Sequence, residues 1–126
     1  MKETIIATVL QAYGYFAEGW ATGNFANYFT MLTEDFIFWF PNGKHGGEFS
    51  GKEGKDHMVG KCLDHAAAGE RLTLFPPHNI TSNEKTVILE FRTAGVLDGM
   101  EYQGRTAIAF DVSGDKISGF REYYGD

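Results

Sequence analysis

The fold of this protein is decided by a stretch near the end of the chain, ISGFREYY at residues 117–124. Side chains alternate between two faces along a β-strand, so Phe120, Glu122 and Tyr124 share one face and Arg121 lies on the other. One face must point into a core, and we expect it to be the face with the two aromatic residues. The stretch therefore predicts a carboxyl group, that of Glu122, at the bottom of an aromatic pocket.

Size and charge limit what this chain can be and what it can bind. Its 126 residues are enough for a single core, so we expect one domain over residues 1–126. Asp and Glu number 17 against 11 Lys and Arg, and no basic stretch is evident, which argues against nucleic acid as a partner. Aromatic residues make up 15% of the chain, which is typical of a lined cavity and equally of a well-filled core.

The sequence also carries signals about its compartment. Cys62 is the single cysteine, which fits a reducing environment, and we expect a cytoplasmic protein. No apolar run approaches the ~20 residues of a membrane-spanning helix, and no apolar signal segment opens the chain. We therefore expect no contact with a membrane.

Three helices are predicted in the first part of the chain. Apolar residues spaced three or four apart predict a helix from Thr4 to Trp20. Asn24 can cap a second, shorter helix, whose apolar face is Phe25, Tyr28, Phe29 and Leu32. Ser50 and Glu53 have the spacing of a capping box and predict the start of a third helix, which Gly69 ends.

Strands dominate the rest. One is predicted at residues 36–40, where Pro41 stops it, and the others at 72–75, 78–82, 86–97, 100–112 and 117–124. Asp98-Gly99 is a tight hairpin turn between the two longest strands. Helices come first and antiparallel hairpins last, which predicts an α+β fold with the helices packed on one mostly antiparallel sheet.

The two longest strands have faces of different character. Bulky side chains occupy one face of each, namely Val87, Leu89 and Phe91 on the first, and Tyr102, Thr106, Ile108 and Phe110 on the second. We expect these faces to meet the helices. The opposite faces should form the outer side of the sheet, with Glu90, Arg92, Arg105, Ala107 and Ala109.

This layout resembles the nuclear transport factor two-like superfamily, in particular its SnoaL-like members. The resemblance covers nearly the whole chain and lies in the opening helix, Gly23-Asn24-Phe25, the strand from Asp35 to Pro41, Ser50-Gly51-Lys52-Glu53 and the closing Glu-Tyr strand. It implies a cone in which a curved sheet wraps around a long helix and encloses an apolar pocket. It also implies a two-fold homodimer through the outer sheet face, where Glu90, Arg92 and Arg105 would pair across the interface.

The superfamily includes ketosteroid isomerases, polyketide cyclases, limonene epoxide hydrolase and pocketed proteins without chemistry, so the resemblance does not fix a function. The three key groups of the ketosteroid isomerase align with Phe40, Phe16 and a position near Thr106, none of which can replace them. We therefore exclude steroid isomerisation by that route. An acid of limonene epoxide hydrolase matches Glu122, but its partner positions read Leu89 and Phe91.

Glu122 is accordingly the expected catalytic acid or base. Desolvation among aromatic rings should raise its pKa, which suits proton transfer near neutral pH. Tyr102 and Tyr124 would polarise a ligand oxygen. The alternatives are a structural glutamate held in a bonded network and tyrosines whose rings only fill space. The expected lining comprises Phe16, Trp20, Phe38, Phe40, Phe91, Tyr102, Thr106, Phe120, Glu122 and Tyr124.

The four histidines do not predict a metal site. His57 and His65 are eight residues apart on one predicted helix, about 12 Å by helical rise, and no metal-ligand spacing is present. His57 should face away from the apolar stripe of its helix. We expect neither a metal nor a cofactor.

Three functions remain open. The first is a SnoaL-like acid/base isomerase, cyclase or hydratase acting on a small apolar carbonyl or polyketide-like compound. The second is a non-catalytic protein that binds a small apolar ligand in the same pocket. The third is a dimerisation or interaction module whose pocket is packed shut. An open cavity that holds Glu122 with a tyrosine hydroxyl within hydrogen-bond reach would favour the first, and an open cavity whose glutamate is tied off in an ion pair would favour the second.

Overall fold

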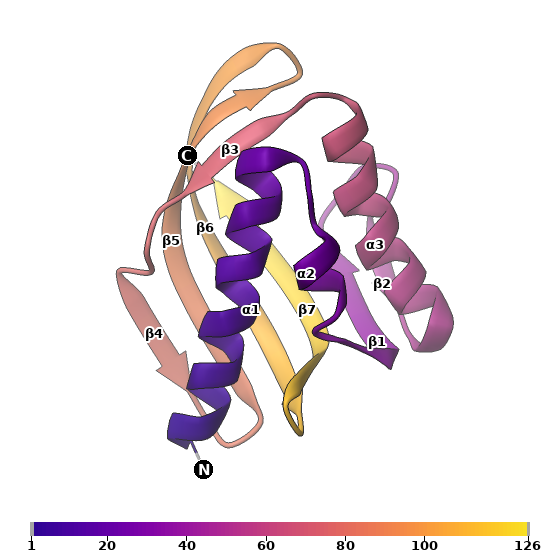
Figure 1. The fold of residues 1–126 in the computed structure, drawn as a ribbon, viewed down its shortest axis with the longest axis vertical. Helices are drawn as coiled ribbons and strands as arrows, with labels where there is room; N and C mark the ends of the chain where they lie inside the picture. The colour runs from indigo at the N-terminus through magenta and orange to yellow at the C-terminus, as the bar shows by residue number, and fades with distance from the viewer. Residues whose placement is uncertain (1, 126) are drawn as a thin grey trace.

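A computed structural model describes residues 2–125 and contains three helices and one seven-stranded sheet in that range (Figure 1). The helices are α1 (Lys2–Thr22), α2 (Ala26–Phe29) and α3 (Gly51–Ala67). The strands are β1 (Leu32–Phe40), β2 (Gly47–Phe49), β3 (Arg71–Leu74), β4 (Asn79–Ser82), β5 (Thr86–Leu97), β6 (Met100–Ser113) and β7 (Lys116–Gly125). All three helices lie on one side of the sheet, which confirms the predicted α+β class.

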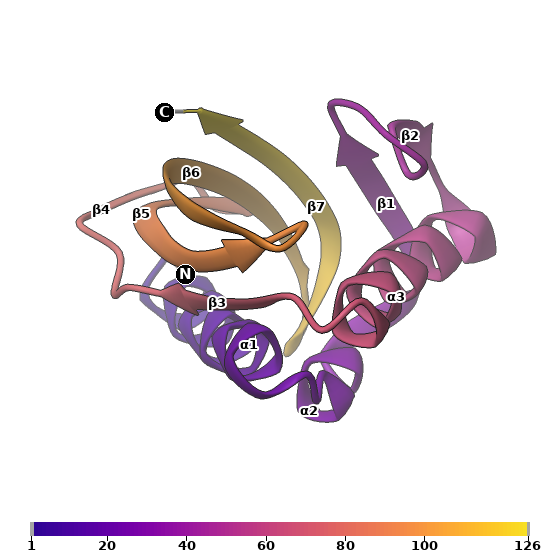
Figure 2. The ribbon, with the colours of Figure 1, turned by 90° about the horizontal axis from the view of Figure 1, so that it is seen from above.

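The sheet has the order β2-β1-β7-β6-β5-β3, and β4 pairs with the other end of β5. Antiparallel pairing joins β5, β6 and β7, whereas β7 and β1 run parallel. Figure 2 shows that the long strands curve strongly and that α3 lies along β1. A curved sheet with helices on one side is what the cone implied by the family resemblance requires.

The core forms where the apolar stripe of α1 meets the inner face of the sheet. Val9, Phe16 and Trp20 from α1 are each at most 7% exposed. Several inner positions of β5 and β6 are also buried, among them Leu89 and Phe110. Fully burying one such side chain contributes about 1.5–3 kcal/mol, so this contact supplies much of the stability of the domain.

Two local predictions differ from the structure. The second helix ends at Phe29 instead of including Leu32, because Leu32 begins β1 and pairs with Ile117 of β7. The three glycines between Asn42 and Gly47 predict a loop there, but Gly47 begins β2, which pairs with the end of β1. Long-range pairing overrides local preference at both places.

No helix among residues 2–125 is both long and apolar enough to cross a membrane.

Gly54 and Gly14 make a matched pair for testing the packing of α3 on the sheet. A Cβ at Gly54 would collide with the carbonyl oxygen of Phe36, whereas a Cβ at Gly14 meets nothing within 4 Å. We expect Gly54→Ala to lower the free energy of unfolding by about 1–3 kcal/mol, because backbone of β1 must move. Gly14→Ala should raise it by about 0.5–1 kcal/mol, because alanine favours a helix. Urea denaturation of both variants measures this, and equal effects would contradict the packing described.

Candidate functional site

A cavity of about 460 Å³ lies between the helices and the inner face of the sheet. Its wall is largely apolar and includes Phe16 and Trp20 of α1, Phe40 of β1, Phe91 of β5 and Ile108 of β6. A volume of this size is in the range of small-molecule binding sites. The cavity is partly open to solvent, and the loop after β1 contributes residues 42–45 to its lining.

Glu122 lies on the cavity wall, the side that the alternation of β7 predicts. Arg121 points to the opposite face of the sheet, where its two terminal nitrogens donate hydrogen bonds of 2.7 and 3.0 Å to Asp111. The cavity leaves the Glu122 side chain partly accessible. Among residues 2–125, no hydrogen bond or ion pair ties off its carboxyl group. Glu122 is therefore available to a ligand.

The environment of Glu122 disfavours its charged form. Burial raises the pKa of the carboxyl above its ordinary value, and the positive charge of Lys61 offsets part of this increase. A carboxyl group whose pKa is raised toward neutrality can both accept and return a proton. The site therefore contains one group suited to acid/base chemistry.

Most of the expected lining lies on the cavity wall, namely Phe16, Trp20, Phe40, Phe91, Tyr102, Thr106, Glu122 and Tyr124. Phe38 and Phe120 do not, although they are on the inner face of the sheet. Both are 0% exposed, and their rings stack on each other with centroids 5.6 Å apart. Phe16 covers Phe120 at 5.8 Å. The two phenylalanines thus form a layer behind the wall.

The two candidate tyrosines, Tyr102 and Tyr124, both line the cavity. The Tyr124 hydroxyl donates to Asn42 Oδ1 at 3.1 Å, and its side chain is 44% exposed. The Tyr102 ring lies over Gly104, where an added Cβ would collide with its hydroxyl oxygen. Tyr124 is therefore engaged with the loop after β1 instead of with Glu122.

Sequence reasoning missed Lys61, which is 6% exposed and lies on the cavity wall. Its Nζ atom lies 4.2 Å from the centroid of the Phe40 ring and 5.7 Å from that of Trp20. Ring faces attract a cation, which helps to hold the charge in this apolar setting. Helical spacing was the available signal, because Lys61 is three residues after the buried Met58 and next to the buried Cys62.

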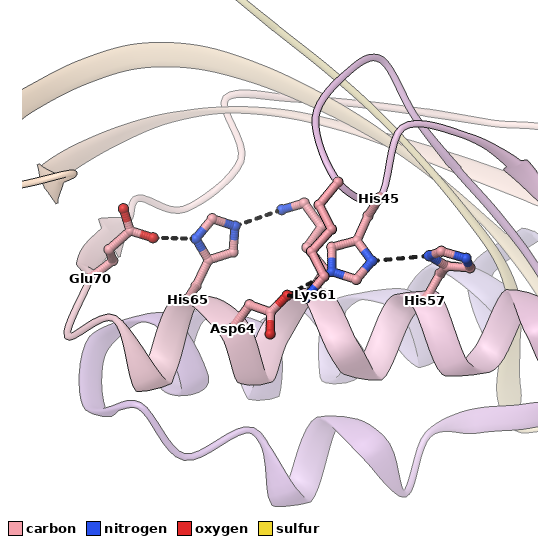
Figure 3. A network of polar contacts seen from close by, with 7 residues as sticks. His45, His57, Lys61, Asp64, His65 and Glu70 are labelled. Atoms are coloured by element: carbon pink, nitrogen blue, oxygen red, sulfur yellow. Dashed lines mark hydrogen bonds and ion pairs between the residues drawn. The ribbon is translucent and has the colours of Figure 1, made fainter.

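A polar network holds the Lys61 side chain in place (Figure 3). The Nζ atom is 3.2 Å from His65 Nε2, and His65 Nδ1 is 2.5 Å from Glu70 Oε1. Glu70 Oε2 accepts a further hydrogen bond of 2.7 Å from the backbone N–H of Asp98. We assign the proton of the imidazole to Nδ1, facing the carboxylate, so that Nε2 accepts from Lys61. Burial, followed by the charge of Lys61, lowers the pKa of His65 and favours this neutral form.

A second cluster lies at the mouth of the cavity. His45 Nδ1 and His57 Nδ1 are 3.0 Å apart, and His45 Nε2 is 2.8 Å from Asp64 Oδ2. The His57 ring stacks on Phe49 of β2 at 3.6 Å. Within the described range, residues 2–125, no three His, Cys, Asp or Glu side chains are grouped to hold a metal ion.

The comparisons with known proteins agree with this geometry. The sequence model of the SnoaL-like domain matches residues 13–120. A solved NTF2-like protein from Anabaena variabilis ATCC 29413 is 36% identical with a TM-score of 0.88, over 98% of this chain and 90% of that one. No curated protein sequence matches this chain.

Two further solved structures share the fold at 16% identity. One is a candidate SnoaL-like polyketide cyclase from Jannaschia sp. CCS1, with a TM-score of 0.76 over 98% of this chain and 86% of that one. The other, from Catenulispora acidiphila DSM 44928, has a ketosteroid isomerase-like fold and was solved with trimethylamine; its TM-score is 0.70 over 91% of this chain and 85% of that one. With a family match over most of its length, the chain belongs to the SnoaL-like domain family of the nuclear transport factor two-like superfamily.

Proposed function

We propose that this protein is an acid/base enzyme of the isomerase, cyclase or hydratase type, acting on a small apolar carbonyl or polyketide-like compound. The observation that carries this proposal is the Glu122 carboxyl, which lies on the wall of an aromatic cavity without a hydrogen bond to another described residue. Structural glutamates are normally tied off by partners. A carboxyl group left open toward a cavity is instead suited to meet a substrate.

The proposed chemistry is proton transfer at carbon. As a base, the Glu122 carboxylate removes a proton from the carbon next to a carbonyl group, which leaves an enolate. The resulting carboxylic acid then returns the proton, to the same carbon or to another. Such positioned proton transfer contributes about 10²–10⁴-fold to a rate. It needs neither a metal nor a redox group, and we propose a reaction without a cofactor.

The remaining candidates would bind and orient the substrate. Phe16, Trp20, Phe40, Phe91 and Thr106 would contact its apolar body, as their places on the wall allow. Tyr102 and Tyr124 would donate to an oxygen atom near the mouth. Tyr124 can do so once a ligand oxygen replaces Asn42 as its acceptor.

Non-catalytic binding of a small apolar ligand is the second candidate. It is favoured by the engagement of the Tyr124 hydroxyl with Asn42, which leaves this tyrosine turned away from Glu122. A closed pocket is not supported, because the cavity is open and measures about 460 Å³.

The single cysteine, a buried free thiol, supports the proposal of a reducing, cytoplasmic setting.

A homodimer through the outer sheet face is also proposed. This face carries exposed apolar side chains, with Ile37 42% and Tyr123 51% exposed, beside the small side chains of Ala107 and Ala109. Trp39 packs on Tyr123 with ring centroids 5.0 Å apart. Glu90, Arg92 and Arg105 lie on the same face and would form complementary pairs across a two-fold axis.

Proton exchange tests the catalytic proposal without knowledge of the natural substrate. The wild-type protein should speed the exchange of the α-protons of β-tetralone, a bicyclic ketone, for deuterium, as followed by NMR. Glu122→Gln should lower this rate by about 10²-fold or more, because the amide cannot accept the proton. Glu101→Gln, on the exposed side of β6, is the matched control and should leave the rate unchanged. Equal rates for the wild type and Glu122→Gln would contradict catalysis by this carboxyl.

The raised pKa of Glu122 predicts how stability depends on pH. Between the ordinary pKa of glutamate, 4.5, and the higher value in the folded protein, the folded state binds more protons than the unfolded state. Glu122 therefore costs stability as the pH rises through this window, by up to ~1.4 kcal/mol per pH unit. Glu122→Gln, which cannot ionise, should be increasingly more stable than the wild type as the pH rises above 4.5. Urea denaturation measures the difference, and a difference that stays constant over this range would refute the desolvation described.

Analytical ultracentrifugation tests the proposed dimer. The wild type should sediment as a dimer at micromolar concentration, and Ala107→Glu should be monomeric because it places a charge at the centre of the face. Ala21→Glu, on the exposed side of α1, should remain dimeric. A monomeric wild type would rule out the dimer.

A further inference from the structure

Three buried polar or charged residues of the described range, residues 2–125, lie on the cavity wall. They are Lys61, Thr93 and Thr106, from α3, β5 and β6, and each is 5–7% exposed. The Thr93 hydroxyl has no hydrogen-bond partner in this range. A buried hydroxyl without a partner costs free energy, so it indicates a position where a bound molecule completes the site.

Lys61 carries a positive charge that its own surroundings only partly satisfy. Its Nζ atom lies close to the Phe40 ring and has one hydrogen-bond partner among the described residues, His65 Nε2. An ammonium group has three N–H donors, which leaves two of them for a ligand. Among residues 2–125, no carboxylate oxygen lies within 4 Å of Lys61 Nζ, the distance limit for an ion pair. The charge of Lys61 is thus directed to the cavity instead of being neutralised in the wall.

The residues behind Lys61 keep this cation in position. Glu70 receives two hydrogen bonds, from His65 and from the backbone of Asp98, so its carboxylate is fixed. The fixed carboxylate orients the imidazole of His65, which also packs on Trp20 with ring centroids 4.6 Å apart. Figure 3 shows the resulting line from Glu70 through His65 to Lys61. This arrangement is typical of a charged group that is pre-organised for binding.

We propose that the ligand of this cavity carries one anionic oxygen, a carboxylate or an ionised acidic enol, and that Lys61 Nζ binds it. The apolar body of the ligand would pack on Phe16, Trp20 and Phe91, and the Thr93 hydroxyl would donate to a second oxygen of the ligand. The inference rests on the proposed use of the cavity as a ligand site, but not on catalysis by Glu122. It narrows the ligand class from apolar carbonyl compounds to acidic ones.

The charges around the cavity favour a single negative charge on the ligand. Two lysines line the cavity, against four acidic side chains, Asp64, Glu70, Asp98 and Glu122. A dianionic group such as phosphate would be repelled by this surplus of carboxylates. A ligand with one carboxylate or enolate group can instead pair with Lys61 alone, while its remaining atoms pack on the aromatic wall.

Isothermal titration calorimetry with paired probes tests the proposal. The probes are naphthalene carboxylate with its neutral carboxamide, and the acidic enol lawsone with its neutral methyl ether. The affinity of the wild type for at least one of the anions should exceed its affinity for the neutral partner by about 10-fold or more, because only the anion pairs with Lys61. The pair that shows the preference tells a carboxylate ligand from an enol ligand. Equal affinities within both pairs, or no anion binding at about 1 mM, would overturn the proposal.

Two variants locate the preference. Lys61→Met should remove this preference. The affinity for the anion should fall about 10-fold or more, whereas the affinity for the neutral partner should change less than about 2-fold. Lys44→Met removes the other lysine of the lining, which is 77% exposed, and should keep the preference. A Lys61→Met protein that keeps the full preference would refute the role of Lys61. If this variant does not fold, the comparison of wild type with Lys44→Met still decides whether a buried cation or the surface lysine is responsible for the preference.

Glu122→Gln should keep the anion preference, so failure of the catalytic proposal is separable from failure of this one.

Discussion

The pairing of β7 with both of its neighbours determines which residues reach the cavity. Glu122 is opposite Ile108 of β6, and Phe120 is opposite Phe38 of β1, so a shift of one residue would turn Arg121 inward. On the outer face, Asp111 holds Arg121 with two hydrogen bonds and accepts a third from Thr86. This bonded group sits on the outer face only in the observed register. The Asp111–Arg121 pair therefore favours the register that places Glu122 on the inner face.

The cavity combines apolar walls with ionisable groups that most cores avoid. Burying a charge without compensation is expensive, and the structure compensates the two central groups in different ways. Burial raises the pKa of Glu122, which favours its neutral form. Lys61 gains contacts with aromatic rings and with the neutral imidazole of His65. A carboxyl group with a raised pKa and a cation held by aromatic rings and an imidazole therefore lie in the same aromatic cavity.

Much of the fold follows from local patterns in the sequence. Alternation and the Asp98-Gly99 turn predict β5 with the bounds that the structure shows, and Ser50 does precede α3, although its side chain makes no capping hydrogen bond. Alternation predicts the side of the sheet on which a residue lies but not its depth. Phe38 and Phe120 are on the inner side of the sheet, as expected, and yet do not line the cavity, because Phe16 covers the ring of Phe120. Lys61 was missed because a lysine on a helix usually faces water, and only the tertiary position of α3 buries it.

The central claim is that the Glu122 carboxyl lies in a desolvated cavity and is open to a ligand. An NMR titration of the ¹³C-labelled glutamate carboxyl groups, with the Glu122 signal assigned from its loss in Glu122→Gln, tests this claim most directly. Glu122 should titrate clearly above the ordinary glutamate value of 4.5. A Glu122 signal that titrates at or below 4.5 would contradict it.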